Sequence, residues 1–318
     1  MGLSPELFKR LSRLNRRLLA GQVTSGDRVG EAAPRPAPGP AFDPTVSLEK
    51  AVPGTECRSR RGRFYRIVRP AEAFWPRPGP ADEEAGPWFD GRRFLAEYRQ
   101  AFLGGGAAVL PQDLHEGFRP LVETDQTRVT YLDVETCGLA GEPVFLVGLM
   151  RYRAAGGRPR EGVLQVEQYL ARDYSEEAAM LEAVWQELAA TACLVTFNGK
   201  TFDLPTVEAR SAACGLFDRP AAPAHVDLLH EARRRWRREL PNCRLQTLEQ
   251  LVCGRRRAGD IPGGDIPAAY HEFVRARLGD DPLRRAVGLR RLQTIIHHNG
   301  LDLLTMAELA ARILAGRF

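Results

Sequence analysis

The sequence predicts an α/β fold in which a mixed five-stranded sheet carries helices on its faces. Three apolar segments follow one another through short turns, which is typical of an antiparallel meander. Two later apolar segments are separated by helical segments, so they should join the same sheet in parallel. In such a sheet the first strand of the meander is expected at the centre. An irregular N-terminal extension precedes this pattern.

Each predicted strand is a short apolar run bounded by turn residues, whereas the predicted helices repeat apolar residues every three or four positions. Strands are expected over residues 128–136, 144–153, 161–170, 193–197 and 225–228. Helices are expected over residues 175–190 and 204–214, and again after residue 228. Gly156 and Gly157 supply a hairpin turn between the second and third strands.

The chain should divide into four segments. These are a basic amphipathic helix (1–20), a linker rich in proline, glycine and alanine (21–44), an accessory segment that packs on the main domain (45–120) and the main domain (121–318). The N-terminal helix either binds a protein or nucleic-acid partner or packs on the rest of this chain. The accessory segment should contain a strand over residues 62–69 and a helix over residues 91–103.

Composition narrows the classes of protein. The 318 residues include 45 basic and 40 acidic side chains, and the resulting net charge of +5 permits a polyanionic partner without requiring one. The six cysteines form no C-x-x-C pair, so we expect reduced residues in a cytoplasmic protein rather than zinc ligands or disulfides. No apolar run reaches the roughly 18 residues of a membrane span, and no signal-peptide pattern opens the chain.

The most informative segment is a strand with two carboxylates spaced by two residues, Asp133 and Glu135. Side chains alternate along a strand, so both acids point the same way while Leu132 and Val134 point to the other face. Two half-buried like charges raise each other's pKa and repel unless a cation neutralises them. Mg²⁺ or Mn²⁺ would suit such oxygen ligands. The alternative is an ordinary solvated strand end.

A second segment follows the strand at 193–197. Asn198 and Gly199 suit a turn, and Lys200 is placed to contact a phosphate. We predict that Asn198 and Lys200 contact the substrate. Asp203 stands at a helix start, where it could serve as an N-cap or add a third carboxylate to the first pair.

A third segment places His298 and Asp302 four residues apart, on one face of a helix. A histidine beside carboxylates can take a proton from an attacking water near neutral pH, although a capping or packing role is the alternative. His297 should point away from Asp302 on a continuous helix. A helix break at Gly300 is the alternative that keeps His297 as a second candidate.

Arginines are frequent after residue 232. The first cluster surrounds Trp236 and consists of Arg233, Arg234, Arg235, Arg237, Arg238 and Arg244, and a second run is Arg255, Arg256 and Arg257. Such runs can neutralise phosphates, and an exposed tryptophan can stack on a base. We predict substrate contacts for Arg234 and Arg238. The alternative is a solvated helix face with Trp236 buried.

Taken in order, the three segments resemble the DEDD (DnaQ-like) 3′–5′ exonucleases of the ribonuclease H-like superfamily, and more closely the YprB-type group. The resemblance covers residues 128 to about 310. The further segments that carry it are Gly199–Pro205, Val226–His230, Arg233–Trp236 and Asp260–Pro267. It implies that the four metal-binding carboxylates are Asp133, Glu135, Asp203 and Asp302. His298 has the tyrosine-type spacing and His297 the histidine-type spacing for the general base.

The resemblance implies a two-metal phosphodiesterase that uses Mg²⁺ or Mn²⁺ and shortens single-stranded DNA or RNA from its 3′ end. Asp133 would bridge both ions, and Glu135 and Asp203 would complete their ligands. Asp302 would hold the ion on the nucleophile side while His298 deprotonates the water. Two other hypotheses share the fold: a nucleic-acid-binding module with weak or no activity, and an endonuclease that cuts RNA/DNA hybrids or junctions.

Overall fold

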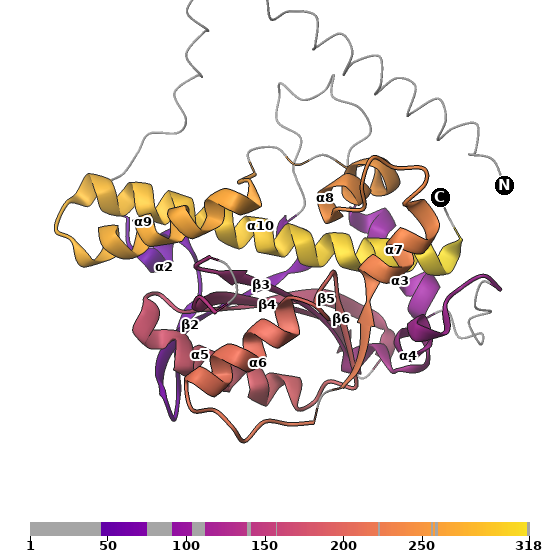
Figure 1. The fold of residues 1–318 in the computed structure, drawn as a ribbon, viewed down its shortest axis with the longest axis horizontal. Helices are drawn as coiled ribbons and strands as arrows, with labels where there is room; N and C mark the ends of the chain where they lie inside the picture. The colour runs from indigo at the N-terminus through magenta and orange to yellow at the C-terminus, as the bar shows by residue number, and fades with distance from the viewer. Residues whose placement is uncertain are drawn as a thin grey trace, which may run out of the picture. The chain divides into compact units, whose positions relative to one another are not determined.

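The computed structural model describes residues 46–74, 91–103, 112–138, 141–156, 158–221, 223–255, 257 and 260–316. The predicted N-terminal helix (1–20) and linker (21–44) lie outside these residues. The described strands form one mixed sheet with the order β1-β2-β5-β4-β3-β6-β7 (Figure 1). Among the described residues, no helix is both long and apolar enough to cross a membrane.

The strands are β1 (Thr55–Ser59), β2 (Gly62–Pro70), β3 (Val129–Thr136), β4 (Val144–Ala155), β5 (Arg158–Leu170), β6 (Cys193–Thr196) and β7 (Ala224–Asp227). The meander β3-β4-β5 is antiparallel, and β6 and β7 run parallel beside β3. All five predicted strands are therefore present. The predicted mixed α/β fold is confirmed, and β3 is central among those five strands.

The sheet is wider than predicted because the accessory segment extends it. β2 pairs antiparallel with β5, and β1 pairs with β2, which makes seven strands in the described sheet instead of five. Without this hairpin the backbone groups along one side of β5 would be unpaired. Phe64 of β2 also stacks on Tyr169 of β5, with ring centroids 5.9 Å apart. The boundary between accessory and main segments at residue 120 stays a prediction.

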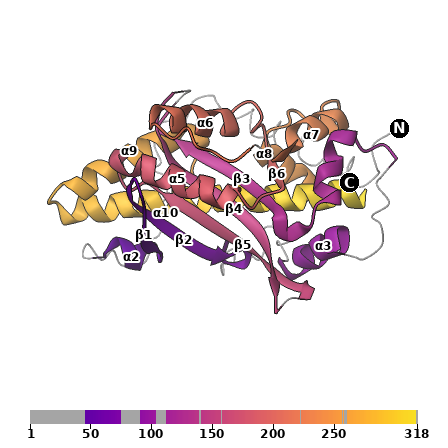
Figure 2. The same ribbon diagram turned by 90° about the horizontal axis from the view of Figure 1, so that it is seen from below.

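Helices cover both faces of the sheet (Figures 1 and 2). The α-helices are α2 (Leu48–Ala51), α3 (Gly91–Leu103), α4 (Arg119–Glu123), α5 (Glu177–Leu188), α6 (Asp203–Ala213), α7 (Leu228–Trp236), α8 (Leu245–Leu248), α9 (Ile266–Leu278) and α10 (Pro282–Ala315). Shorter helical turns are η1 (Ala71–Phe74), η2 (Glu116–Phe118), η3 (Gln126–Arg128), η4 (Tyr174–Glu176), η5 (Glu249–Cys253) and η6 (Gly263–Asp265). The helices predicted over residues 91–103, 175–190 and 204–214 are α3, α5 and α6.

The helix break that was the alternative at Gly300 does not occur, because α10 continues through it to Ala315. Glycine is needed there for packing: a Cβ at Gly300 would overlap the ring of Phe74, from η1 in the accessory segment. α10 also contacts α3 and α2, so it links the accessory segment to the sheet. A continuous α10 keeps His298 and Asp302 on one helix face.

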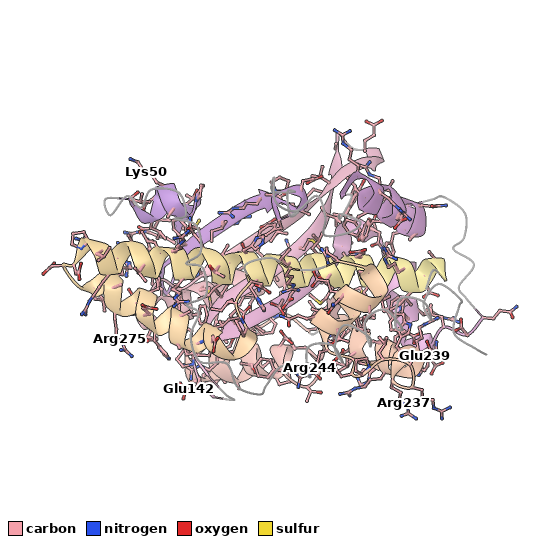
Figure 3. All side chains as sticks on the ribbon, turned by 90° about the horizontal axis from the view of Figure 1, so that it is seen from above. Lys50, Glu142, Arg237, Glu239, Arg244 and Arg275 are labelled. Atoms are coloured by element: carbon pink, nitrogen blue, oxygen red, sulfur yellow. The ribbon has the colours of Figure 1, made fainter. Side chains whose placement is uncertain are left out.

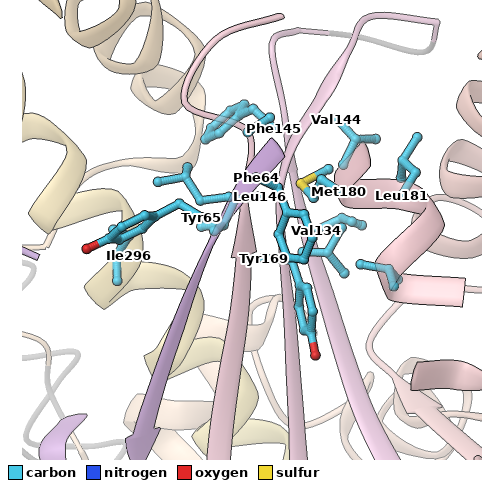
Figure 4. Close-up of a cluster of buried hydrophobic side chains, with 14 of the residues drawn as sticks. Phe64, Tyr65, Val134, Val144, Phe145, Leu146, Tyr169, Met180, Leu181 and Ile296 are labelled. Carbon is cyan, nitrogen blue, oxygen red and sulfur yellow. The ribbon is translucent and has the colours of Figure 1, made fainter. Parts of the chain in front are cut away.

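The two faces of β3 are chemically different. Leu132 and Val134 are buried in the hydrophobic core, as are Met180 and Leu181 of α5 (Figure 4). The acids at 133 and 135 point to the opposite face, where α10 crosses the strand. The alternation within β3 thus separates an apolar core from a polar site.

Candidate metal and catalytic centre

Three elements bring the predicted site residues together. β3 carries Asp133 and Glu135, the first turn of α6 carries Asp203, and α10 carries His298 and Asp302. β3 and β6 are parallel neighbours, so the loop after β6 returns to the edge of the sheet at which β3 ends. Figure 3 looks onto α10 as it crosses the strands. The sheet order therefore explains how Asp133 and Asp203, 70 positions apart, share one site, and the packing of α10 on β3 adds His298 and Asp302.

Asp133 is held by a residue that sequence reasoning missed, Asn299. The Asn299 Nδ2 donates to Asp133 Oδ2 at 2.8 Å, and its Oδ1 accepts from Gln168 Nε2 at 2.8 Å. Asn299 is fully buried and fits because β4 has Gly148 opposite it, where any Cβ would overlap the amide. A polar residue in the middle of a buried helix face was the signal that could have found it.

Asp203 does not act as an N-cap. It is the first residue of α6, and the N-cap position is occupied by Phe202, which makes no side-chain capping bond. The Asp203 Oδ1 accepts instead from the backbone N–H of Val134 in β3, at 3.1 Å. Its side chain is almost fully buried. This bond ties the α6 carboxylate to the strand that carries the other two acids.

His298 and Asp302 touch each other and two residues outside the predicted set, Asp260 and Arg257. His298 Nε2 lies 3.4 Å from Asp302 Oδ2, and His298 Nδ1 lies 2.9 Å from Asp260 Oδ1. Arg257 donates to Asp302 and lies 3.1 Å from Asp260. His297 instead stacks on Phe74, with ring centroids 6.1 Å apart. Of the two candidate bases, His298 is the one in contact with a predicted metal-binding carboxylate.

Burial and charge shift the site pKa values in opposite directions. Burial, reinforced by the neighbouring carboxylates, raises the pKa of Glu135 to about 8 and of Asp203 to about 7. Burial also raises the pKa of Asp133 well above its usual range. Burial by itself would lower the pKa of His298, but hydrogen bonds to Asp260 and Asp302 raise it to about 11.

Asp302 behaves differently from the other three carboxylates. Its burial favours the neutral acid, but the charges of Arg257 and His298 outweigh that effect and hold its pKa below the usual range. In the metal-free protein Asp302 is therefore ionised near neutral pH, whereas burial and the neighbouring carboxylates favour the protonated forms of Glu135 and Asp133. The cations Arg257 and His298 thus act most strongly on Asp302, whereas burial outweighs the charge of His298 at Asp133 and Glu135.

The donor set suits a hard divalent cation, although it is not arranged around one. Among the described residues, no three acidic, histidine or cysteine side chains already surround a common point as metal ligands. Asp133, Glu135 and Asp203 nevertheless offer only oxygen atoms, and their raised pKa values indicate negative charge that a cation would neutralise. Asp302 has one oxygen on Arg257 and the other facing His298. It would have to exchange a partner to bind an ion.

The Asn198 turn is hydrogen-bonded to Asp227 and lies beside a pocket lined by both basic and acidic side chains. Asn198 has a left-handed backbone, with φ 66°. The backbone N–H groups of Asn198 and Lys200 donate to the carboxylate of Asp227, at 2.8 and 3.1 Å. Lys200 and Arg234 line a pocket of about 220 Å³, whose lining also includes two histidines and two acids, His115, His230, Asp227 and Glu231. The structure thus brings together two of the four predicted substrate-binding residues.

The first arginine cluster surrounds Trp236 on α7 and on the residues that follow it. Trp236 is buried, as the solvated-helix alternative expected, and Arg234 and Arg235 both bond to Glu231. Five of the cluster are exposed, two of which are labelled in Figure 3: Arg233, Arg234, Arg237, Arg238 and Arg244.

The second arginine run is internal where the structure describes it. Arg255 is buried, 3.2 Å from Glu249 and 3.5 Å from Glu308. Arg257 contacts Glu249 at 2.7 Å as well as the two aspartates named above. Arg256 lies outside the described residues. Arg255 and Arg257 are therefore committed to internal carboxylates and are not available to a phosphate backbone.

Comparisons with known proteins point to the same region of the chain. Residues 130–314, more than half of the chain, match the profile of a family described as the RNase_H superfamily. The chain is also similar to a Bacillus subtilis (strain 168) protein named "Uncharacterized protein YprB", with 34% identity over 191 residues. That match covers 58% of this chain and 41% of the relative, so this chain spans less than half of the relative's length. The family match includes all five predicted catalytic positions.

Proposed function

The chain belongs to the RNase H superfamily, and on that premise we propose that it is a divalent-metal-dependent nuclease of the DEDD type. We further propose that it shortens single-stranded DNA or RNA from the 3′ end. The observation that carries this proposal is the meeting of four acids and one histidine from β3, α6 and α10. Three of these acids have pKa values raised by burial and by one another.

In the proposed mechanism Asp133, Glu135 and Asp203 hold the divalent cations, with Asp302 as a fourth ligand after it exchanges a partner. Bound Mg²⁺ or Mn²⁺ would neutralise charge on the scissile phosphate and lower the pKa of the attacking water. Asn299 keeps the Asp133 carboxylate in place through its 2.8 Å bond. The pocket beside Lys200 and the exposed side chain of Arg238 are assigned to the phosphate backbone.

His298 is assigned to accept the proton of the attacking water at Nε2, the ring nitrogen that faces Asp302. A pKa of about 11 means that His298 is a cation in the metal-free protein. The negative charge of Asp302, and that of Glu135 when it is ionised, are among the causes of that high value. Positive charge held by these carboxylates lowers the pKa, so the histidine becomes a base only in the loaded site.

Metal affinity should depend on pH with a defined sign. Glu135 and Asp203 have raised pKa values, about 8 and 7, so both must lose protons when they bind a cation. We expect the apparent affinity for Mn²⁺ to rise about tenfold per proton per pH unit between about pH 6 and pH 8. Calorimetry in buffers with different ionisation enthalpies would measure the released protons. Glu135→Gln should release fewer, and an affinity independent of pH would contradict the assignment.

Arg238 is exposed on the turn after α7. Its charge should contribute to the affinity for single-stranded DNA or RNA. Arg238→Gln is expected to weaken binding equally for all sequences and to reduce the salt dependence by about one charge. Titrations at several salt concentrations would measure this change. Arg284→Gln is the control, because Arg284 lies about 27 Å from Asp302 along α10. An Arg238→Gln protein with unchanged salt dependence would remove this residue from the interface.

The length of the products separates the three functional hypotheses. Purified protein would be incubated with 5′-labelled single-stranded DNA and RNA, in Mn²⁺, Mg²⁺ or EDTA. A metal-dependent ladder that shortens from the 3′ end is the result that the proposal expects. Oligomers released from hybrid or junction substrates would favour an endonuclease, and binding without cleavage would favour a nucleic-acid-binding module.

A further inference from the structure

We propose that Asp260 is a positioning residue that fixes the orientation and tautomer of the His298 imidazole. Asp260 lies outside the four predicted metal-binding carboxylates, on the segment between η5 and η6. The inference rests on the proposed function, in which His298 takes a proton at Nε2. The inference adds a fifth carboxylate to the site, and this carboxylate contacts His298.

The contact between the two side chains is close and buried. His298 Nδ1 lies 2.9 Å from one oxygen of Asp260 and 3.0 Å from the other. The two side chains are 6% and 11% exposed. Because water reaches this contact poorly, a carboxylate facing Nδ1 strongly favours a proton on that nitrogen.

Asp260 is itself held from two directions. Arg257 donates to Asp260 Oδ2 at 3.1 Å, and the same guanidinium contacts Glu249 at 2.7 Å and also Asp302. The next residue, Ile261, is buried in the hydrophobic core and anchors the backbone there. The carboxylate therefore has a fixed place from which to orient another side chain.

The two ring nitrogens consequently face different groups. Nδ1 points to Asp260, and Nε2 points to Asp302 at 3.4 Å, on the side of the predicted metal ligands. A neutral ring that keeps its proton on Nδ1 presents the lone pair of Nε2 to that side. Without Asp260 the neutral ring can carry its proton on Nε2 instead, and that nitrogen then cannot accept one.

The chain supplies a matched control. The tripeptide Asp-Ile-Pro occurs twice, at Asp260 and again at Asp265. Asp265 is exposed and makes no side-chain capping bond at the start of α9. Asp265→Asn therefore makes the same chemical change, in the same local sequence, away from His298.

The test compares Asp260→Asn, Asp260→Glu and Asp265→Asn with wild type, in cleavage kinetics and in ¹⁵N-histidine NMR spectra of the Mg²⁺-bound protein. For Asp260→Asn we expect kcat to fall about 10- to 100-fold, while KM and the Mn²⁺ Kd stay within about twofold. Asp260→Glu should recover part of the loss, and Asp265→Asn should match wild type. The His298 signal, assigned with His298→Gln, should show protonated Nδ1 in wild type and a shift toward protonated Nε2 in Asp260→Asn.

The outcomes separate this inference from the proposed function. If wild type cleaves and Asp260→Asn retains full kcat with an unchanged His298 signal, Asp260 has no positioning role. If wild type cleaves no substrate, the proposed nuclease activity fails, and the NMR comparison still decides the orientation of His298. If Asp260→Asn does not fold, Asp260→Glu decides: an unchanged kcat together with loss of the Nδ1 proton would overturn the inference.

Discussion

An Asp133→Asn protein should fold with wild-type stability or better and lose metal-dependent cleavage by about a thousandfold or more. Burial and the neighbouring carboxylates raise the pKa of Asp133 well above its usual range, so the metal-free fold favours the neutral acid, which an amide imitates in shape and charge. The amide carbonyl can still accept from Asn299, which donates at 2.8 Å. What the substitution removes is the anionic ligand of a bound cation.

Three measurements check this expectation: thermal unfolding, the increase in Tm on adding Mn²⁺, and the rate of shortening of a 5′-labelled strand. Asp218→Asn is the control, since Asp218 is exposed on the loop between α6 and β7. The Mn²⁺ effect on Tm should shrink in Asp133→Asn and persist in Asp218→Asn. Cleavage by Asp133→Asn at the wild-type rate in a clean preparation would show that the carboxylate site is not the nuclease centre.

Arg257→Ala should lower the free energy of unfolding of the metal-free protein by about 3–5 kcal/mol near neutral pH. The Arg257 side chain is 7% exposed and lies against three carboxylates, Glu249, Asp260 and Asp302. Its removal leaves buried negative charge without a partner. Divalent cations should restore part of the lost stability, because they can neutralise Asp302 in place of the guanidinium.

The pH dependence of this effect follows from Asp302 and Asp260, whose folded-state pKa values lie below their usual range. Groups of this kind stabilise the fold above the unfolded-state pKa and lose that contribution as pH falls through the folded-state pKa. The penalty of Arg257→Ala should therefore be largest near neutral pH and shrink in acid.

Chemical denaturation at several pH values, with and without Mg²⁺, would measure the penalty. The control is Arg277→Ala, which removes the more exposed pair with Asp173 at 2.8 Å and should cost about 1 kcal/mol or less. If Arg257→Ala cost no more than this control, the guanidinium would not be the internal counter-ion of the site.

The local pattern of apolar and turn residues was enough to predict the five strands, two of the helices and the shared direction of two pairs of site residues. The five strands, the helices α5 and α6 and the central place of β3 follow from apolar periodicity and turn residues. The shared direction of Asp133 and Glu135 follows from the alternation of a strand, and that of His298 and Asp302 follows from the helical repeat. These are short-range properties of the backbone, so the residue order alone determines them.

Other features depend on partners that are distant in the sequence. The β1-β2 hairpin joins the sheet because β5 has a free edge. Arg255 and Arg257 belong to a run of basic residues in the sequence. Their carboxylate partners nevertheless include Glu308 and Asp302, about fifty positions later. Nothing in the local sequence marks such residues as internal rather than solvated.

The arrangement of the site shows the same division. The order of residues determined which acids and which histidines are present, and that β3 and α10 each present two of them on one face. Only tertiary structure decided that Asn299 fits over Gly148 to hold Asp133, and that Asp260 faces His298. The reason is physical. A buried polar group must find a partner in three dimensions, and the packing of the whole domain decides which one is within reach.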